Sequence, residues 1–430
     1  MSRQIYYGVT AAAVAAALAA ASCAAKTGDR AAASLDAAAR AYVGFVLALG
    51  ERDSDSLDAY HGPAAWQAEA RAQHASLADI RARAGASADA LVAHAPGGQD
   101  EDGPRRAFLV RQLRAVVSRI DVLQGARPAF DEEAMMLFGL DTARDRDGAR
   151  GGGAPRDPGE VRTAIDRLLP GPGDLRSRYA AFDRQFLVAP DRLSAVLARA
   201  IDGCRAATRA RVPLPEAERV EVALVRDLPW SAFTRYTGGF ASRVQVNAAL
   251  PLTVDRALDL ACHEAYPGHH TIDVLLDARF GSRRPEFLVR PLFSPQTLLH
   301  EAAASLAPGL AFTDADRLAF ERDELFPLAG LDPSRADRYV AVARLVDQLH
   351  AVAGDVARRY LDGALDFPRA AAALERDALM PSSDATLKFV NQFRSYAATY
   401  TIGRDRLAAA VGRDWTAYVR AVSDPGQVLP

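Results

Sequence analysis

Apolar residues recur at helical spacing along most of the chain, and this pattern predicts a mainly α-helical protein. Residues 31–94 show the spacing in stretches such as LDAAARAYVGFVLALGERDSDSLDAY, and residues 105–141 resume it. From residue 255 onward the pattern is helical again, with breaks at GSRRPE, FPLAGLDPS and LDFP. Alanine, leucine and arginine are abundant while runs of β-branched residues are few, which also favours helices.

Residues 220–250 have a different pattern. VEVALV and SRVQVNAAL cluster or alternate β-branched residues, and YTGGFAS lies between them. This pattern predicts a small sheet just before the histidine-rich segment of the chain. YTGGFAS is either an exposed strand edge that pairs with an extended peptide or a plain hairpin turn.

Glycine, proline and charged residues gather in RDRDGARGGGAPRDPGE at residues 144–160, which predicts a flexible surface loop. GGQDEDGP at 97–104 and PGPGDL at 170–175 are typical of a loop and a turn. We therefore divide the mature chain into an N-terminal helical region, residues 23–160, and a second region, residues 161–430.

The N-terminus has the pattern of an export signal. Arg3 precedes GVTAAAVAAALAAA, an apolar run of about 14 residues that is short for a membrane span, and AASC follows it. We predict that residues 1–22 are a lipoprotein-type signal peptide and that Cys23 is the lipidated first residue of an exported periplasmic or cell-envelope protein. Ala20 stands where such signals usually have leucine, so the alternatives are an ordinary cleaved signal or a weakly apolar N-terminus that is retained.

The net charge indicates which binding partners to expect, and the cysteine content indicates whether disulfide bonds hold the fold. A formal net charge of -2 gives no reason to expect a nucleic-acid partner, and any membrane contact is expected only through a lipid on Cys23. Apart from Cys23 the chain has Cys204 and Cys262, and two cysteines do not make a disulfide framework. We interpret Cys262 as a small buried apolar residue and not as a metal ligand.

The segment ALDLACHEAYPGHHTIDVLL, residues 257–276, begins like the zinc-protease motif H-E-x-x-H. However, the residue four places after His263 is Pro267, and the next histidines are His269 and His270. On a regular helix these two lie about 9 Å and about 10.5 Å from His263 along the axis, which is too far for a shared metal ion. A metal site here requires a deformed helix.

The sequence supplies the means for that deformation. Pro267 cannot donate a hydrogen bond to the carbonyl of His263, and Gly268 tolerates unusual backbone angles. A bulge at Tyr266-Pro267-Gly268 brings the second histidine back towards the metal. Glu301, 37 residues after Glu264, is the candidate third ligand on a following helix, and His300 is a weaker one. The alternative is a histidine-bearing helix end together with an ordinary helix glutamate.

The segment HEAYPGHH resembles the signature of a bacterial family, still named as a domain of unknown function, whose members carry HExxPGHH and are similar to gluzincin zinc metallopeptidases. Five segments resemble that family in order: LLPGPGDLRSRY, RDLPWSAFTRYTGGFASRVQVN, LDLACHEAYPGHH, RPLFSPQTLLHE and FRSYAATYTIGRDRL. The resemblance covers about residues 165–410 and identifies residues 161–430 as the metallopeptidase-like catalytic region.

The resemblance implies a mainly α, gluzincin-like helical metallopeptidase fold with a small β-sheet bordering the active-site cleft. It implies zinc bound by His263, His269 and Glu301, with Glu264 as general base. His269 is preferred to His270 because family members vary more at the second position. The sequence EAAAS after the distal glutamate departs from the family's Gly-Trp or Gly-Thr, which bears on local packing and substrate shape.

These residues predict a zinc-dependent hydrolase that cleaves peptide bonds with a metal-activated water, and a peptide or peptide-like substrate. Glu264 takes the proton of the water, and Tyr400 or Arg394 faces the oxyanion, with Tyr396 behind them. One alternative is a non-catalytic, zinc-stabilised envelope lipoprotein, although Glu264 is not needed to hold a metal. Another is a zinc hydrolase of non-peptide amides.

Overall fold

The computed structural model describes residues 35–93, 102–142, 157–228, 230–424 and 426. The predicted signal peptide and Cys23 lie outside these residues, as do most of the predicted loops at 97–104 and 144–160. The division of the mature chain at residue 160 stays a prediction.

The N-terminal part consists of helices and one short strand. Residues 35–50 are helical, and a 3-10 turn at Ser54–Ser56 leads into strand β1, Leu57–Tyr60. The helices that follow are α2 (Ala64–Ala72), α3 (Leu77–Ala93), α4 (Gly103–Leu123) and α5 (Phe130–Phe138). Residues 57–60 were expected to continue a helix, and that expectation is wrong, because they pair with strand β5 (Val289–Pro291) far along the chain.

The middle of the chain places a small sheet beside a group of helices. Three helices come first, α7 (Pro158–Leu168), α8 (Leu175–Asp183) and α9 (Leu193–Arg209). The sheet follows with β2 (Arg219–Val225), β3 (Ala232–Gly238) and β4 (Ala241–Asn247). Helices α10 (Val254–Glu264), α11 (His269–Arg279) and α12 (Pro295–Ala311) come after it.

Within the sheet the strand order is β2-β4-β3, with β2 parallel and β3 antiparallel to β4. Gly239 and Phe240 make the turn between β3 and β4 with φ angles of 60° and 62°, and Gly238 at the end of β3 has a φ of 81°, a backbone region that favours glycine. The segment YTGGFAS therefore contains a hairpin turn, and β3 is an edge strand of the sheet.

The remainder of the chain is helical. Its helices are α13 (Asp314–Phe320), α14 (Phe326–Ala329), α15 (Ala336–Asp347), α16 (His350–Leu361), α17 (Phe367–Asp377), α18 (Ser383–Phe393), α19 (Arg404–Val411) and α20 (Trp415–Val422). Two π-helical segments, η5 (Glu321–Leu325) and η8 (Thr399–Gly403), and the 3-10 segment η7 (Arg394–Ala398) interrupt them.

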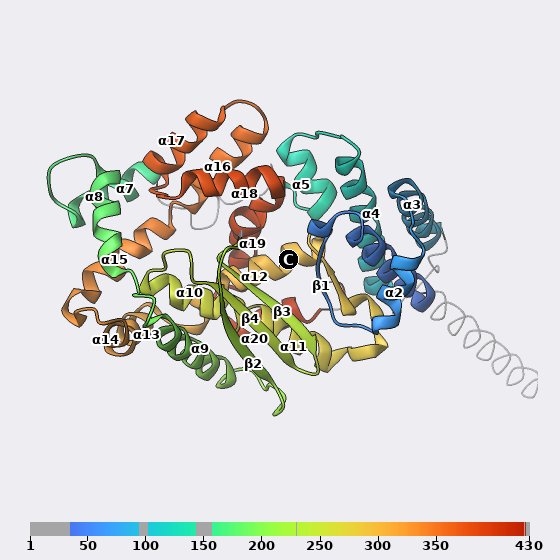
Figure 1. The fold of residues 1–430 in the computed structure, drawn as a ribbon, viewed down its shortest axis with the longest axis horizontal. Coiled ribbons are helices and arrows are strands. Elements are labelled where there is room, and N and C mark those ends of the chain that lie inside the picture. The colour runs from blue at the N-terminus through green and yellow to red at the C-terminus, as the bar shows by residue number, and fades with distance from the viewer. Residues whose placement is uncertain (1–34, 94–101, 143–156, 229, 425, 427–430) are drawn as a thin grey trace, which may run out of the picture.

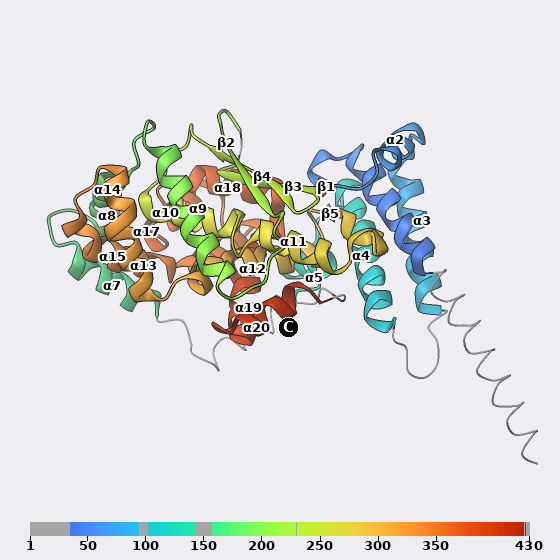
Figure 2. The same cartoon turned by 90° about the horizontal axis from the view of Figure 1, so that it is seen from below.

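Helices far apart in sequence share the same core. One buried cluster joins residues of the first helices, from Leu35 to Leu140, with residues between Ile272 and Val422. A second cluster joins α7, α9 and α10 with the helices around Phe326 and Tyr339. In both views α2 to α4 lie at one end of the molecule and α7, α8, α14 and α15 at the other, with α10 to α12 between them (Figures 1 and 2).

The prediction of a mainly helical protein with a small sheet next to the histidine segment is confirmed. The predicted strands correspond to β2 and β4, and the predicted turn at 170–175 leads into α8. None of the helices formed by the described residues has both the length and the apolar character of a membrane span.

Candidate metal centre

The helix that carries His263 is broken before it reaches the next histidines. α10 ends at Glu264, α11 begins at His269, and the peptide bond between Tyr266 and Pro267 is cis. We call residues 265–268 the bend. Gly268 donates its N–H to the carbonyl of Cys262 at 3.0 Å, and a Cβ on Gly268 would lie 1.8 Å from the carbonyl oxygen of His263. Only glycine fits this close approach of two backbones.

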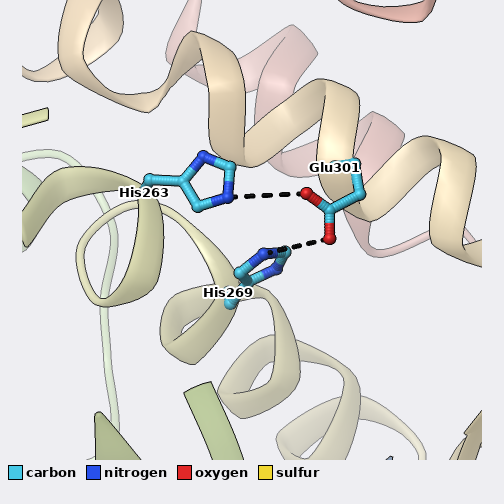
Figure 3. Close-up of side chains that lie close together, drawn as sticks. All are labelled: His263, His269 and Glu301. Atoms are coloured by element: carbon cyan, nitrogen blue, oxygen red, sulfur yellow. Dashed lines mark ion pairs between the residues drawn. The ribbon is translucent and has the colours of Figure 1, made fainter. Parts of the chain in front are cut away.

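The bend brings His263 and His269 together, with ring centroids 4.8 Å apart. Glu301 faces both of them from α12: its Oε2 lies 3.5 Å from His263 Nε2, and its Oε1 lies 3.4 Å from His269 Nε2 (Figure 3). The three ligand-type atoms lie within 4.8 Å of one another. Among the described residues, this is the one group of three or more such side chains close enough to hold a metal ion.

Glu301 is positioned by the start of its helix. The hydroxyl of Ser294 caps α12 by accepting the N–H of Thr297 at 3.2 Å, and Pro295 occupies the first turn. Two helical turns later, the helix presents Glu301 to the bend. Burial raises the pKa of this carboxyl, but the imidazoles of His269 and His263 more than offset that and hold the pKa well below its usual range. Glu301 is therefore an anion.

The donor set fits a divalent ion of the zinc type. Two imidazole nitrogens and one carboxylate oxygen are the ligands of many catalytic zinc sites, which keep a fourth position open. His269 and Glu301 are buried, whereas His263 keeps 18% of its side chain exposed. The Oε2 atom of Glu301 is buried and accepts no hydrogen bond from the described residues, so a cation beside it would compensate for the missing donor.

Glu264 lies directly after His263 and is buried. Its Oε2 accepts a hydrogen bond from the hydroxyl of Thr234 on β3 at 2.7 Å. Burial lowers the pKa of His269, but the negative charges of Glu301 and, to a smaller extent, of Glu264 raise it above its usual value, so Glu264 lies within electrostatic reach of the cluster. Sequence reasoning found Glu264 but not Thr234, because the link joins residues 30 positions apart.

Of the predicted oxyanion residues, Tyr400 lies against the cluster. It belongs to the π-helical segment η8, and its ring stacks over His263 at a centroid distance of 6.3 Å. Tyr396 lies behind it, 5.6 Å from Tyr400 between ring centroids. Burial and the negative charge of Glu301 raise the pKa of Tyr400 well above its usual range. Its phenol therefore keeps its proton and can donate a hydrogen bond.

Arg394 has a different environment. Its Nε donates to Oε2 of Glu133 on α5 at 2.6 Å, and the side chain of Glu133 is almost fully buried. Glu133 also accepts from the N–H and hydroxyl of Ser395. This pairing ties η7 to α5 and gives Arg394 a structural partner, whereas its oxyanion role stays a prediction.

The two remaining histidines of the predicted set lie outside the cluster. His270 is fully buried, with Nε2 3.0 Å from Glu218 Oε2 and Nδ1 2.7 Å from the hydroxyl of Ser242. Of the two histidines after the bend, the structure thus brings His269 and not His270 to Glu301. His300 points to Arg290 at 3.4 Å, and burial together with the Arg290 charge lowers its pKa to about 3.

Arg290 connects the cluster to the N-terminal part of the chain. Its Nε donates to Asp58 on β1 at 2.5 Å, and its NH1 donates to Asp273 on α11 at 3.0 Å. Asp273 lies one helical turn after His269, and its pKa is lowered because the charge of Arg290 outweighs burial. Sequence reasoning missed Arg290 and Asp273, although the first opens a segment that resembles the metallopeptidase-like family.

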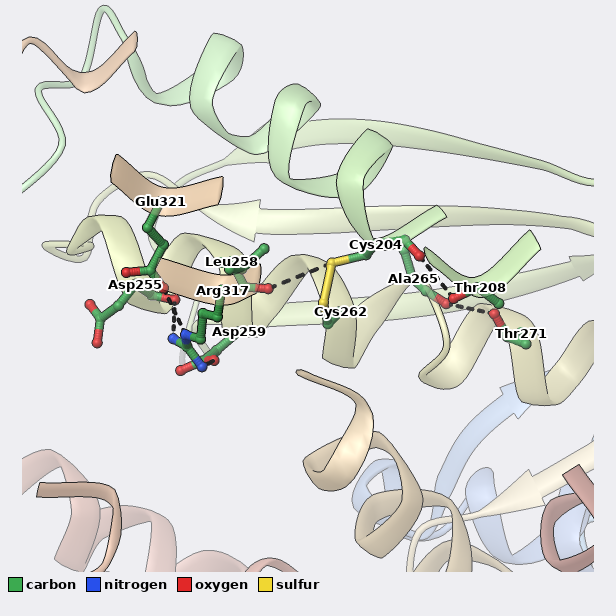
Figure 4. The surroundings of a disulfide bond; sticks show 10 residues. All are labelled: Cys204, Thr208, Asp255, Leu258, Asp259, Cys262, Ala265, Thr271, Arg317 and Glu321. Atoms are coloured by element: carbon green, nitrogen blue, oxygen red, sulfur yellow. Dashed lines mark hydrogen bonds and ion pairs between the residues drawn. A yellow bond between two sulfur atoms is a disulfide. The ribbon is translucent and has the colours of Figure 1, made fainter. Parts of the chain in front are cut away.

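The expected burial of Cys262 is confirmed, but its bonding partner was not expected. Cys204 on α9 and Cys262 on α10, 58 positions apart in sequence, form a disulfide bond with a Cα–Cα distance of 5.4 Å (Figure 4). Cys262 is buried, as expected, but it is covalently bonded to its partner. Nothing in the spacing of two cysteines reveals that their helices pack side by side, so this bond became visible only in the structure.

Comparisons with known proteins leave the family open. No protein-family model matches the chain, and no curated protein matches it. Among solved structures, a "putative lipoprotein" from Colwellia psychrerythraea aligns over 82% of this chain and 68% of its own, with 15% identity and a TM-score of 0.47. An M32 carboxypeptidase from Deinococcus radiodurans R1 aligns over 94% and 89%, with 18% identity and a TM-score of 0.47. Likenesses at this level carry no argument about activity.

Proposed function

We propose that this chain is a zinc-dependent hydrolase of the gluzincin type that cleaves peptide bonds. The observation that carries the proposal is the convergence of His263, His269 and Glu301 across a broken helix, with the buried carboxylate of Glu264 directly after His263 in sequence. A metal ion held by these three residues gives a reason for a bend that otherwise places two histidines against one buried carboxylate.

When bound, zinc acts as a Lewis acid that acidifies a water molecule and polarises a carbonyl group. Residues of the chain carry out proton transfer and stabilise the developing negative charge. Glu264, buried and anchored by Thr234, accepts the proton of the attacking water and passes it to the leaving amine. Tyr400, whose phenol stays protonated, donates a hydrogen bond to the oxygen on which negative charge develops.

The sheet supports a peptide as the substrate. β3 is an edge strand, and the same strand carries Thr234, which holds Glu264. The carbonyl of Thr234 on the outer edge of β3 accepts from Arg290 at 3.5 Å. An extended peptide that pairs with the rest of this edge would run past the catalytic carboxylate, with main-chain hydrogen bonds fixing its register. A hydrolase of non-peptide amides would have no need for such an edge.

Hydrolysis and metal content test this proposal together. Purified protein is expected to hold about one zinc ion per chain by elemental analysis, and His263→Ala, His269→Ala and Glu301→Ala each to lose it. A peptide-library digest read by mass spectrometry is expected to show cleavage by the wild type and none after chelation. Zinc-loaded protein that cleaves no peptide or amide would favour the alternative of a zinc-stabilised scaffold, and absence of zinc binding would contradict both.

We also propose that the protein is exported and anchored to the cell envelope through lipid on Cys23. The Cys204–Cys262 bond supports an oxidising compartment, because disulfides rarely persist in the cytosol. Mass spectrometry of the native N-terminus is expected to find Cys23 carrying a lipid. An intact Met1 in the cytoplasmic fraction would contradict the proposal.

A further inference from the structure

A buried carboxylate connects the two sides of the bend. Glu218 stands between α9 and β2, and its side chain is fully buried. One oxygen, Oε1, accepts hydrogen bonds from Arg205 at 2.8 Å and from Arg209 at 2.6 Å, both on α9. The side chains of Arg205 and Arg209 are 39% and 40% exposed, so the network runs from solvent to the interior.

The other oxygen of Glu218 holds residues on both sides of Pro267. Oε2 accepts the hydroxyl of Tyr266 at 2.5 Å and the Nε2–H of His270 at 3.0 Å. Tyr266 precedes the proline, and His270 directly follows His269. The carboxylate of Glu218 thus links Tyr266, before Pro267, to His270, after it. Both of its oxygens accept hydrogen bonds.

The main chain alone fixes the bend poorly. Pro267 has no N–H, and the regular hydrogen bonds of an α-helix stop at Ala265 and resume with the N–H of Ile272 on the carbonyl of Gly268 at 3.0 Å. Across the gap only the N–H groups of Gly268 and Thr271 bond back, to the carbonyls of Cys262 and Ala265. Side chains therefore have to set how far α11 is turned relative to α10.

Two neighbouring residues of α9 help to fix the orientation of α11 relative to α10. Cys204 on α9 is bonded to Cys262, the residue before His263, while the neighbouring Arg205 reaches Glu218. α9 therefore holds α10 just before the first histidine and, through Glu218, holds α11 just after the second. The hydroxyl of Tyr418 adds a contact to the carbonyl of Pro267 at 2.9 Å.

We infer that Glu218 is a positioning residue for the metal centre: by holding Tyr266 and His270, it sets the separation of His263 and His269. This inference rests on the proposed function, because it assigns a role toward the metal that these histidines would bind. It also gives His270 a role, since its ring is an anchor of the bend. Groups that hydrogen-bond directly to metal ligands commonly change metal affinity 10- to 100-fold when they are removed, and Glu218 acts one residue further away, through Tyr266 and His270.

The test compares Glu218→Ala with a matched variant, Glu286→Ala. Glu286 is also fully buried and also paired with an arginine, Arg105 on α4, at 2.7 Å, but none of its bonds reaches the bend. Zinc affinity is measured by competition with a chelating indicator, and site geometry by the visible spectrum of the cobalt(II)-loaded protein. Circular dichroism establishes that each variant is folded at the temperature used.

We expect Glu218→Ala to weaken zinc binding by about tenfold, the low end of the range for direct partners of metal ligands, and to change the cobalt spectrum, while Glu286→Ala changes neither. Glu218→Gln keeps the shape and two polar atoms and is expected to recover most of the affinity. Should Glu218→Ala not fold, Tyr266→Phe removes a single hydroxyl from the network and is expected to weaken zinc binding measurably, with a spectral change in the same direction.

The outcomes separate this inference from the proposed function. Wild-type protein that binds neither zinc nor cobalt would overturn both. Wild-type protein that binds them, with Glu218→Ala or Tyr266→Phe folded and equal to it in affinity and cobalt spectrum, would overturn only the positioning role. Equal losses in Glu218→Ala and Glu286→Ala would also overturn it, because they would reflect general destabilisation.

Discussion

The hydroxyl of Thr234 lies 2.7 Å from Oε2 of Glu264 and 2.8 Å from the carbonyl oxygen of the same residue. A hydroxyl has one hydrogen, so it is shared between a carboxylate and the last carbonyl of α10. The contact fixes both the rotamer of Glu264 and the end of the helix that carries it. An edge strand of the sheet thus positions the group that we propose as general base.

Replacing Thr234 with valine removes this hydroxyl while keeping the shape of the side chain. A hydrogen bond to a charged group contributes about 1.5–3 kcal/mol, so we expect Thr234→Val to lower kcat by about tenfold or more, with zinc content unchanged. Thr234→Ser keeps the hydroxyl and serves as the control. Steady-state kinetics on a cleaved peptide provides the measurement, and a wild-type kcat in Thr234→Val would show that the contact has no catalytic role.

The carboxylate of Glu264 can be tested without changing its size. Glutamine cannot accept a proton, so Glu264→Gln is expected to retain zinc and thermal stability while hydrolysis falls about 10²–10⁴-fold. Adding Thr234→Val to this variant is expected to cause little further loss, because the hydroxyl acts through the same carboxylate. Additive losses in the double variant would mean that the two residues act independently.

The Cys204–Cys262 bond closes a loop of 58 residues. Loop-closure entropy at this length corresponds to about 4 kcal/mol, so the Cys204→Ser, Cys262→Ser double variant is expected to unfold at clearly lower denaturant concentration. Chemical denaturation followed by circular dichroism measures the difference. As a control, alkylation of denatured wild type without reductant should modify neither cysteine; two modified thiols would show that the bond is absent.

Glu321 makes stability depend on pH through a buried acid. Burial, opposed by Arg317 and reinforced by Asp255, raises its pKa to about 7. In the unfolded chain the carboxyl ionises at its ordinary, lower pKa, so the free energy of unfolding falls as the pH rises from about 4.5 to about 7 and stays lower above that. Glu321 therefore opposes folding at pH 8 and does not do so at pH 4.5.

Glu321→Gln removes the ionisable group and keeps an oxygen that can accept from Arg317. We expect the variant to match wild type near pH 4.5 and to exceed it in unfolding free energy at pH 8 by up to about 3 kcal/mol. Denaturant titrations at both pH values give the comparison. A difference between Glu321→Gln and wild type that is the same at both pH values would mean that the pKa of Glu321 is unshifted.

Local chemistry explains what the sequence could predict of this site. Pro267 and Gly268 stand between the histidines, and their backbone properties alone indicate a broken helix. The periodicity of residues 220–250 likewise predicts strands where β2 and β4 occur. In each case neighbouring residues suffice for the inference.

The missing parts depend on tertiary packing. The Glu218 and His270 side chains meet across 52 residues, and Asp58 meets Arg290 across 232. Each of these contacts exists only because helices or strands distant in sequence lie side by side. Neither the spacing nor the composition of the chain indicates which distant helices and strands lie side by side. For the same reason the sequence did not predict the disulfide, and residues 57–60 were expected to be helical.

The shared core has a consequence for how the chain is made. The first helices, from Leu35 to Leu140, complete their core with residues as late as Val422, and β1 pairs with Val289–Pro291. A ribosome therefore releases these helices long before the surfaces that cover them, and their apolar faces stay uncovered until synthesis is almost finished. A chain kept unfolded until it has crossed a membrane would find all of its partners at once on the far side.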